Sequence, residues 1–432
     1  MAVDRGAAPL SSSVPCGVQV FRISRSWEDI PVKGNSDLLI GIASVDITPP
    51  VGVTLSGYTP RISRSIGHAL RAEAMACRRG DKAWVLVASD TIGYGRDDVA
   101  EIRDRIRQAC GLPGEAVMIC ATHTHSGPAT LFGGDGLNDL DRQYLADLKG
   151  KLADVAVAAF RSAEPGRLET TWTEAPSLAH NRRVKGEDGA WGNEWWDPDG
   201  KHPGYVDPSV MLVGVRRPDG CLAALMVNYG CHPVTLGYDS FAVSPDYPGY
   251  LKDALERQAV AGTVLFVNAG GGNVNPRVCI EVGDEHPRKM GEALAAIVAS
   301  AVGRLAPVAD GPLAWRREPW TLVRTREPRK PLDRPGFHVG DSIPTEIQAL
   351  RVGDLGLIGL PGELFSEYSR MLRDISSVPQ TVVVQLANDC ISYLPTDEAM
   401  AQGAYESKSA PVEGMQDMIM EHAGKAFAAI AD

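Results

Sequence analysis

Residues 116–128 read AVMICATHTHSGP, an apolar run that ends in two histidines. A short apolar run bounded by turn residues is typical of a buried strand, here from Ala116 to Thr122. His123 and His125 stand two positions apart, so in extended backbone their side chains point to the same side. Two such imidazoles indicate a metal-binding pair, or one metal ligand beside one acid–base group. A hydrogen-bonded histidine pair that only closes the strand explains the spacing as well.

Four more apolar runs lead directly into loops that carry polar residues. The runs are 222–228, 263–268, 354–360 and 381–386. The loops that follow them contain His232, the glycines and asparagines of 270–275, Glu363, and the segment from Asn388 to Tyr393. Ligands of α/β proteins bind beyond the carboxyl ends of the strands. If the strands share one sheet and one direction, we expect the five loops to converge on one site.

Amphipathic segments alternate with these strands. The predicted helices are 97–110, 142–161, 247–258, 287–301 and 363–375. Such alternation predicts the α/β class. We predict a single compact domain over residues 37–432, with mixed β-sheets flanked by helices, after an N-terminal extension over residues 1–36. Two aperiodic stretches, 184–208 and 324–346, are predicted to be long loops over the domain, the first covering a site.

The bulk composition is that of an ordinary globular chain: 432 residues, 44% hydrophobic and 22% charged. The net charge of −11 argues against nucleic acid as a partner, because phosphate binding needs clustered Lys and Arg. No stretch approaches the ~20 apolar residues of a membrane span, and the first residues do not resemble a secretory signal. The eight cysteines are scattered, and most are expected to be reduced core residues. We expect a cytoplasmic protein that acts on a small molecule, without nucleic acid or membrane. Whether it forms a homo-oligomer stays open.

Several candidate residues have a structural explanation beside the functional one. His232 lies between a strand end and Pro233, where a lone histidine is more often structural. Glu363 opens a predicted helix, where an acidic side chain favours the macrodipole. Arg182 and Arg183 suit a substrate anion or an oxyanion, but two solvated surface arginines are the simpler explanation.

The glycine and tryptophan clusters have no assigned ligand. Residues 270–272 are three glycines without the Lys-Ser/Thr of a phosphate loop or the spacing of a dinucleotide fingerprint, which excludes both. Trp191, Trp195 and Trp196 would form a wall of a substrate pocket, or would pack their own loop down.

Six short motifs occur in the order found in the neutral/alkaline ceramidase family, whose catalytic domain the chain resembles. The most distinctive motif is THTHSGP, residues 122–128. The other motifs are Gly41-Ile42-Ala43 with Asp46-Ile47-Thr48, Asn181-Arg182, Gly272-Asn273-Val274-Asn275-Pro276, Gly362-Glu363, and Asn388-Asp389 followed by Tyr393 and Tyr405. The resemblance implies a catalytic domain of that fold.

The resemblance also implies a site built around a zinc ion. The implied ligands are His123, His232, Glu363 and Tyr393. The groups implied around the reacting carbonyl are His125, Arg182 and Tyr405. An unperturbed phenol ionises only near pH ~10, but a neighbouring dication lowers its pKa, so a tyrosine ligand is chemically reasonable. Donors of these types also suit other divalent ions, such as manganese.

Two positions depart from the family pattern. Where the family has Gly-Asp-Val-Ser-Pro, this chain has Asn273 and Asn275 in place of the aspartate and the serine. A serine-based step at that position is therefore excluded. From the sequence we also expect no C-terminal immunoglobulin-like domain and no secretory signal, both of which the family has. These departures favour the shorter, soluble, lactonase-like members of the superfamily.

The predicted reaction is hydrolysis of a lactone or ester of a small, polar, sugar-acid-like substrate. Zinc lowers the pKa of bound water to roughly 7, which supplies a nucleophile at neutral pH. Tyr405 or Arg182 would stabilise the oxyanion, His125 would carry a proton to the leaving group, and Asn275 would hydrogen-bond the substrate. Two alternatives stay open. One is an amidase for N-acyl bonds, which needs a stronger proton donor at the leaving nitrogen; the other is a protein that binds a metal or ligand without catalysis.

Overall fold

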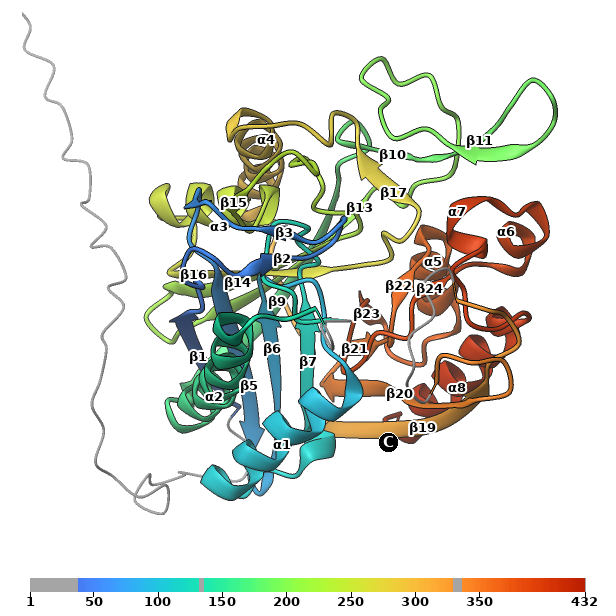
Figure 1. Ribbon diagram of the computed structural model, residues 1–432. Helices are drawn as coiled ribbons and strands as arrows, with labels where there is room; N and C mark the ends of the chain where they lie inside the picture. The colour runs from blue at the N-terminus through green and yellow to red at the C-terminus, as the bar shows by residue number, and fades with distance from the viewer. Residues whose placement is uncertain (1–37, 132–135, 329–335, 432) are drawn as a thin grey trace, which may run out of the picture.

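Three β-sheets come together at the centre of the protein, and helices cover them from outside (Figure 1). The computed structural model describes residues 38–131, 136–328 and 336–431. The predicted N-terminal extension, residues 1–36, lies outside the described residues. The predicted α/β class with mixed sheets is confirmed.

Each sheet combines antiparallel strands with one parallel pair at its edge. The first sheet has the order β7 (Val117–Ala121), β6 (Lys82–Ser89), β5 (Arg71–Arg79), β1 (Leu39–Asp46), β8 (Glu164–Pro165). The second has the order β16 (Thr263–Asn268), β14 (Leu222–Tyr229), β13 (Ser209–Arg216), β9 (Arg167–Glu174), β18 (Ala306–Pro307). The third has the order β19 (Leu313–Val323), β20 (Ser342–Val352), β21 (Leu355–Gly359), β23 (Gln380–Val384).

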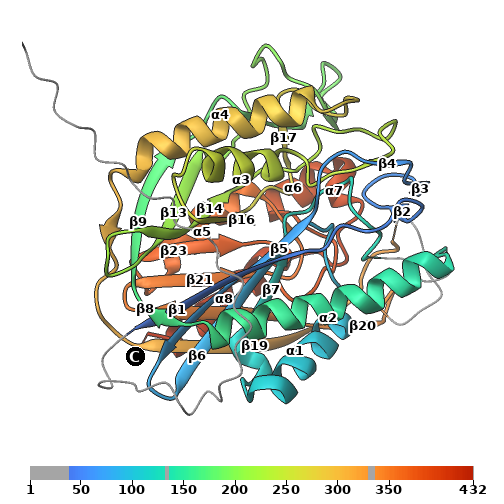
Figure 2. The same cartoon turned by 90° about the vertical axis from the view of Figure 1, so that its left-hand side faces the viewer.

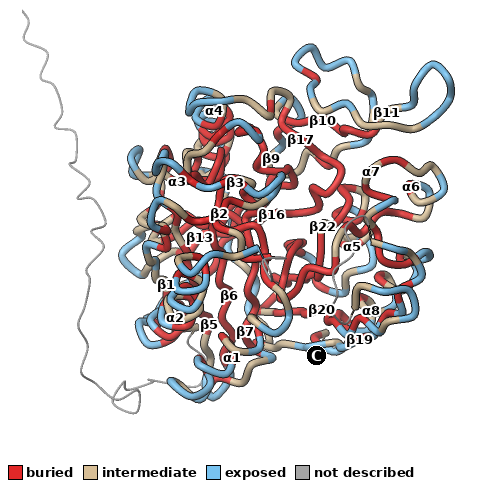
Figure 3. Tube along the Cα trace, in the orientation of Figure 1, coloured by how far each residue is buried: buried red, intermediate tan, exposed pale blue. Residues whose placement is uncertain are grey.

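Five two-stranded ribbons extend from this framework. They are β2 (Thr54–Leu55) with β3 (Arg61–Ile62), β4 (Ser65–Ile66) with β15 (Ala242–Val243), β10 (Ala179–Asn181) with β17 (Val274–Pro276), β11 (Arg183–Lys185) with β12 (Trp191–Asn193), and β22 (Glu363–Leu364) with β24 (Tyr393–Leu394). The tip of the β11–β12 hairpin, residues 186–190, is fully exposed, whereas its base at Arg183 is buried (Figure 3).

The helices pack in three groups, one for each sheet. Helix α2 (Asp139–Arg161) crosses β1 and β5, with α1 (Arg96–Cys110) beside it (Figure 2). Helices α3 (Tyr247–Arg257) and α4 (Glu285–Val302) pack together against the second sheet. Helices α5 (Ser366–Ile375) and α8 (Met415–Ala429) pack against the third sheet. Two short helices, α6 (Asp397–Gln402) and α7 (Ala404–Ser407), lie between them in the chain.

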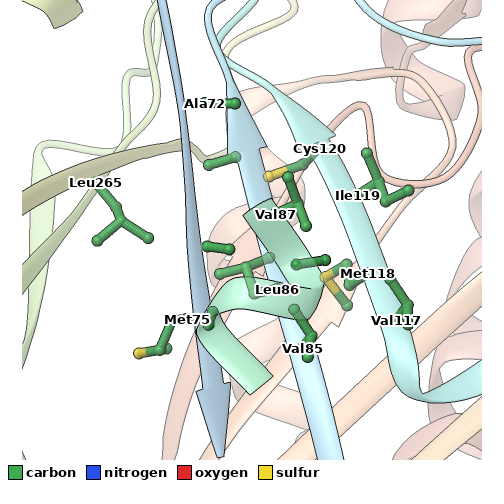
Figure 4. Close-up of a cluster of buried hydrophobic side chains, with 14 of the residues drawn as sticks. Ala72, Met75, Val85, Leu86, Val87, Val117, Met118, Ile119, Cys120 and Leu265 are labelled. Carbon is green, nitrogen blue, oxygen red and sulfur yellow. The ribbon is translucent and has the colours of Figure 1, made fainter. Parts of the chain in front are cut away.

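The central core lies between the first sheet and the other two. Strand β6 is buried on both faces from Ala83 to Ser89, which explains why its sequence is one continuous apolar run. Figure 4 shows Leu86 of β6 beside Met75 and Met118 from its neighbouring strands, with Leu265 of β16 facing the same cluster. This apolar contact joins the first two sheets and thereby brings the ends of their strands close together.

A buried asparagine connects two of the sheet edges where the parallel pairs meet. Asn268, the last residue of β16, is fully buried. Its Nδ2 donates to the backbone oxygens of Thr122, at 3.0 Å, and Cys231, at 3.2 Å. These residues directly precede His123 and His232, so one amide group holds both histidine loops.

A buried glutamine makes the matching connection on the third sheet. Gln385, which follows β23, donates its backbone N–H to Asn268 O at 3.0 Å. Its Oε1 accepts from the backbone N–H groups of Leu364, at 3.2 Å, and Gly271, at 3.4 Å. Since Leu364 follows Glu363, the amide side chains of Asn268 and Gln385 together place three of the predicted metal ligands.

A buried ion cluster ties α3 to the first sheet. Lys252 Nζ lies 3.0 Å from Glu73 Oε1 and 2.8 Å from Asp90 Oδ2, and all three side chains are buried. Asp90 begins the segment after β6 that contacts His123. Helix α3 therefore supports the segment that contacts His123, and it also covers the second sheet.

The loops converge as expected, although the condition that their strands share one sheet does not hold, and one predicted helix start is wrong. The five strands before the polar loops do not share one sheet; they belong to three, and the loops converge because the three parallel edges meet. The helix expected from Glu363 begins at Ser366, because Glu363 and Leu364 pair with Tyr393 and Leu394 as a short parallel ribbon.

Parts of the two predicted loops form strands, and residues 329–335 of the second loop lie outside the described residues. The stretch 184–208 begins with the β11–β12 hairpin, and the end of 324–346 belongs to β20, which pairs with β19 over its whole length. Within the described ranges, no helix has both the length and the apolar character needed to cross a bilayer. Six described cysteines are free thiols, as expected for most of them, while Cys221 is disulfide-bonded.

Replacing the Asn268 amide tests whether it holds the sheet edges together. In Asn268→Asp the Nδ2 donor becomes an oxygen that faces two carbonyl oxygens, so we expect a loss of about 3 kcal/mol in the free energy of unfolding. The control is Asn138→Asp, because a carboxylate still caps α2 and the donor that is lost, from Nδ2 to Gly52 O at 3.3 Å, is exposed to solvent. Urea titration of both variants measures the difference; equal stabilities would contradict the role of Asn268.

Candidate metal centre and active site

Three histidines and one glutamate meet above the ends of the parallel strands. Glu363 Oε2 lies 3.1 Å from His232 Nε2 and 3.3 Å from His123 Nε2. His125 Nε2 is 3.4 Å from His123 Nε2. One nitrogen from each histidine lies within 4.8 Å of the others. Residues far apart in the sequence therefore come within reach of one cation.

The hydrogen bonds of the rings fix their tautomers. His123 Nδ1 lies 2.7 Å from Ile92 O, and His232 Nδ1 lies 2.7 Å from Gly271 O. A backbone carbonyl only accepts, so each Nδ1 carries the proton, and each neutral ring points the lone pair of Nε2 at the Glu363 carboxylate.

The Nε2 lone pairs and the Glu363 carboxylate are all electron-rich acceptors, so a cation between them is needed to offset their repulsion. A proton is a poor candidate, because burial lowers the pKa of His232 to about 4. Two imidazole nitrogens and a carboxylate oxygen, each ring oriented by a carbonyl, form a donor set that fits a divalent metal.

The backbone around His123 is strained in order to place its ring. His123 has a φ of 76°, in the left-handed region that non-glycine residues rarely adopt. Its N–H donates to Thr91 O at 2.9 Å, and the Asn268 side chain holds the residue before it. Strained residues persist where the surroundings determine their conformation, and they cluster at functional sites.

Tyr393 lies at the edge of the cluster. It pairs with Glu363 across the β22–β24 ribbon, and its ring stacks on His232 with centroids 6.5 Å apart. Its hydroxyl accepts from Arg182 Nη2 at 3.2 Å. Burial raises the pKa of the Tyr393 phenol well above its usual value, and a nearby dication acts in the opposite direction. Direct ligation by Tyr393 stays a prediction.

Arg182 is buried, which makes the expectation of a solvated surface arginine wrong, and the same holds for Arg183. Arg182 Nε donates to Glu406 at 2.7 Å, Nη1 to Asn275 Oδ1 at 3.1 Å, and Nη2 to Gly272 O at 2.8 Å. Buried guanidinium groups need acceptors and a countercharge, and this site supplies both.

Asn275 and the aromatic residues surround this guanidinium. Asn275 is buried on β17, beside Cys279 and Trp195. The Tyr405 ring lies 5.7 Å from the rings of both Tyr393 and Trp195. Of the three tryptophans, Trp195 contacts the site, Trp191 packs on Arg183, and Trp196 is exposed. Trp195 alone fits the predicted pocket wall.

The β2–β3 hairpin holds His125 in place. Arg61 Nη2 donates to His125 O at 2.8 Å. The Tyr58 and His125 rings pack edge to face, with their centroids 5.0 Å apart. Gly57 has a φ of 87°, and a Cβ there would lie 2.3 Å from the His125 ring. Burial lowers the pKa of His125 well below its usual value, so the ring is neutral.

The structure thus brings all eight predicted site residues into one region. The metal candidates His123, His232 and Glu363 are in contact, with Tyr393 next to them, and His125, Arg182, Asn275 and Tyr405 surround them. Their chemical roles stay predictions.

Sequence reasoning missed three residues that organise the site: Asn268, Gln385 and Glu406. For Glu406 a signal was present, because it directly follows Tyr405. For the two amides no local pattern distinguishes them from polar loop residues.

Comparison with known proteins agrees with this geometry. No protein-family model matches the chain. Neutral ceramidases B and A of Dictyostelium discoideum are each 25% identical to it, over 288 and 281 residues. These alignments cover 62% and 60% of this chain, but only 39% and 38% of those relatives. The chain therefore spans about two fifths of the length of the curated relatives it matches.

Solved structures show the same fold. The neutral ceramidase from Pseudomonas aeruginosa superposes with a TM-score of 0.72 at 19% identity, over 90% of this chain and 74% of that one. A ceramidase complexed with C2 gives the same score at 18% identity, over 92% of this chain. The architecture is that of the neutral ceramidase structures. The chain is therefore similar in sequence to neutral ceramidases and shares their fold, in line with the resemblance of its motifs.

Removing one histidine tests the metal centre. We expect the purified protein to bind one divalent ion, and His123→Ala to bind it more than about 100-fold more weakly, because even an indirect partner of a ligand contributes 10- to 100-fold. Isothermal titration and elemental analysis measure this. His286→Ala, in the first turn of α4, is the control and should bind normally. Full metal occupancy in His123→Ala would show that the ligand set is wrong.

Asp389 predicts a pH dependence of stability. It accepts hydrogen bonds from Thr345 and from the backbone of Cys390 and Arg96, and burial raises its pKa from 3.8 to about 6. The folded protein then binds more protons than the unfolded chain between these values, so stability falls as the pH rises from about 4 to 6.

The variant Asp389→Asn keeps an acceptor in the same place and does not titrate. We expect the wild type to lose about 2 kcal/mol more than this variant between pH 4 and 6, as measured by urea titration at each pH. Parallel stability curves for the two proteins would contradict the shift.

Proposed function

We propose that the protein is a metal-dependent hydrolase of N-acyl bonds, with zinc as the ion. The observation that supports this best is the position of His125, whose Nε2 lies 3.4 Å from His123 Nε2 at the cluster. An amide has a poor leaving group, so it needs a proton donor at the leaving nitrogen. The similar proteins are also named ceramidases, which supports an amide substrate over the lactone or ester expected from the sequence.

The residues of the cluster fit a resident metal. His123, His232 and Glu363 would hold it, with Tyr393 as a fourth candidate, and imidazole with carboxylate is a donor set that zinc prefers. When bound, a divalent ion polarises the carbonyl and makes water more acidic. Asn275 stands where the family has serine, so attack by water on the carbonyl carbon needs no protein nucleophile.

The other side chains supply the proton transfers and the binding of charge. Neutral His125 accepts the proton of the attacking water as the new carbon–oxygen bond forms. It then passes the proton to the nitrogen as the carbon–nitrogen bond breaks, which yields a carboxylate and an amine. Arg182 donates to the developing oxyanion; such a donor contributes about 3 kcal/mol.

A matched substrate screen tests this function. We expect the protein to cleave N-acyl amines faster than lactones or alkyl esters of similar acyl groups. A chelator should abolish turnover, and added zinc should restore it. Activity that survives complete removal of metal would contradict the proposal, and cleavage of lactones alone would return the assignment to a lactonase. Metal binding without turnover of any class would indicate a non-catalytic protein.

The variant His125→Gln separates the proton transfer from the rest. With an amide substrate we expect kcat to fall about 10²- to 10⁴-fold. With an aryl ester, whose leaving group needs no proton, only the loss of the base at the attacking water remains, so the fall in kcat should be smaller than with the amide. Equal losses on both substrates would exclude His125 as the proton donor.

A further inference from the structure

We propose that Glu406 is a positioning residue that orients Arg182 toward the substrate carbonyl. This inference rests on the proposed hydrolase function for its catalytic consequence, but the orientation itself is measurable without activity. Glu406 lies on α7, next to Tyr405, and its side chain is fully buried.

One carboxylate of Glu406 collects three donors. Its Oε1 accepts from Arg182 Nε at 2.7 Å and from Asn193 Nδ2 at 2.8 Å, and its Oε2 accepts from Arg183 Nη1 at 3.0 Å. Burial alone would raise the pKa of Glu406, but the adjacent Arg182 guanidinium holds it below its usual value. The carboxylate is therefore charged and acts as the counterion of two buried arginines.

The position of Arg182 in the chain makes this shared contact possible. Strand β10 ends at Asn181 and β11 begins at Arg183, so Arg182 lies in the break between two ribbons. Neighbours on one continuous strand point to opposite sides. The break allows two consecutive arginines to reach the same carboxylate.

The hydrogen bonds of Arg182 leave one donor for a substrate. A guanidinium has five N–H groups. Four have acceptors: Glu406, Asn275, Gly272 and Tyr393. Within the described residues the fifth N–H, on Nη1, has no acceptor. Because Glu406 binds Nε, it sets the plane of the group and hence the direction of this remaining N–H.

Asn193 extends the same network to Tyr405. Asn193 Oδ1 accepts from the backbone N–H of Tyr405 at 3.2 Å, while its Nδ2 donates to Glu406. Arg183 Nη2 donates to Ala399 O at 3.1 Å. The β11–β12 hairpin and the α6–α7 segment are thus locked together around Glu406, which keeps Arg182 and Tyr405 on the same side of the cluster.

Nitrogen-15 NMR of the metal-free protein tests the orientation directly. A guanidinium held by four acceptors rotates slowly about Nε–Cζ, so Arg182 should show separate, exchange-protected Nη1 and Nη2 signals, assigned by their loss in Arg182→Lys. In Glu406→Gln the charge is lost at constant shape, and we expect these signals to merge or disappear. If they are unchanged, Glu406 does not position Arg182.

Kinetics of the metal-loaded protein test the catalytic consequence. A misplacement of about 1 Å costs roughly 10²-fold, so we expect kcat of Glu406→Gln to fall by that order with KM nearly unchanged. In the double variant Arg182→Met, Glu406→Gln, the loss should equal that of Arg182→Met alone. The proposal would be overturned if the loss in the double variant equalled the product of the two single losses. Merged NMR signals with an unchanged kcat in Glu406→Gln would overturn it as well.

Two further variants keep the result interpretable. Glu406→Asp keeps the charge and should recover part of both signals if Glu406→Gln does not fold. Glu346→Gln removes a carboxylate that is also buried between two arginines, Arg103 and Arg317, and should lower stability without changing the Arg182 signals or kcat. If the wild type cleaves no N-acyl amine while the Arg182 signals still depend on Glu406, the positioning stands and the proposed function fails.

Discussion

The site depends on a seam of buried amide hydrogen bonds where three sheet edges meet. Asn268 holds the backbone before His123 and before His232, and Gln385 holds the residue after Glu363. Each contact is an ordinary hydrogen bond, worth about 1 kcal/mol in net stability. Their importance lies elsewhere: in a low-dielectric interior an unpaired polar group is costly, so these contacts favour the relative placement of the three edges in which the Asn268 amide and Gln385 Oε1 are paired.

This constraint explains how a metal site arises from separate sheets. A single parallel sheet would place its strand exits in a row along one edge. Three parallel pairs that meet at their edges place the exits around a common centre, which suits ligands that must surround one ion. This arrangement is electrostatically unfavourable without a cation, because the Nε2 lone pairs and a carboxylate face each other across about 3 Å. Hydrogen bonds hold His123 in a strained backbone conformation, and the buried Lys252 cluster anchors Asp90, which begins the segment that contacts His123.

The sequence predicted the strands well because their physical cause is local. The predicted runs 116–122 and 263–268 are almost entirely buried, and continuous apolar character follows directly from that burial. The residues that bear chemistry were also visible, since they stand at strand exits. The division of the strands among three sheets was not predictable. A buried parallel strand has the same apolar sequence pattern whether it belongs to one large sheet or to one of several smaller sheets.

Long-range partners account for the other errors. Arg182 and Arg183 have the local sequence of surface arginines, and they are buried only because Glu406 lies more than 200 residues later in the chain. Glu363 precedes a helix in sequence, but its partner in a parallel ribbon is Tyr393. Such pairings leave no periodicity for a local pattern to detect.

The β11–β12 hairpin combines a buried base with an exposed tip at residues 186–190. Changes in length at the tip leave the ion pairs at the base untouched, and exposed tips are where proteins accept insertions most readily. Relatives of this chain can therefore vary the length of this one turn while Arg183 and its partner Glu406 stay in place.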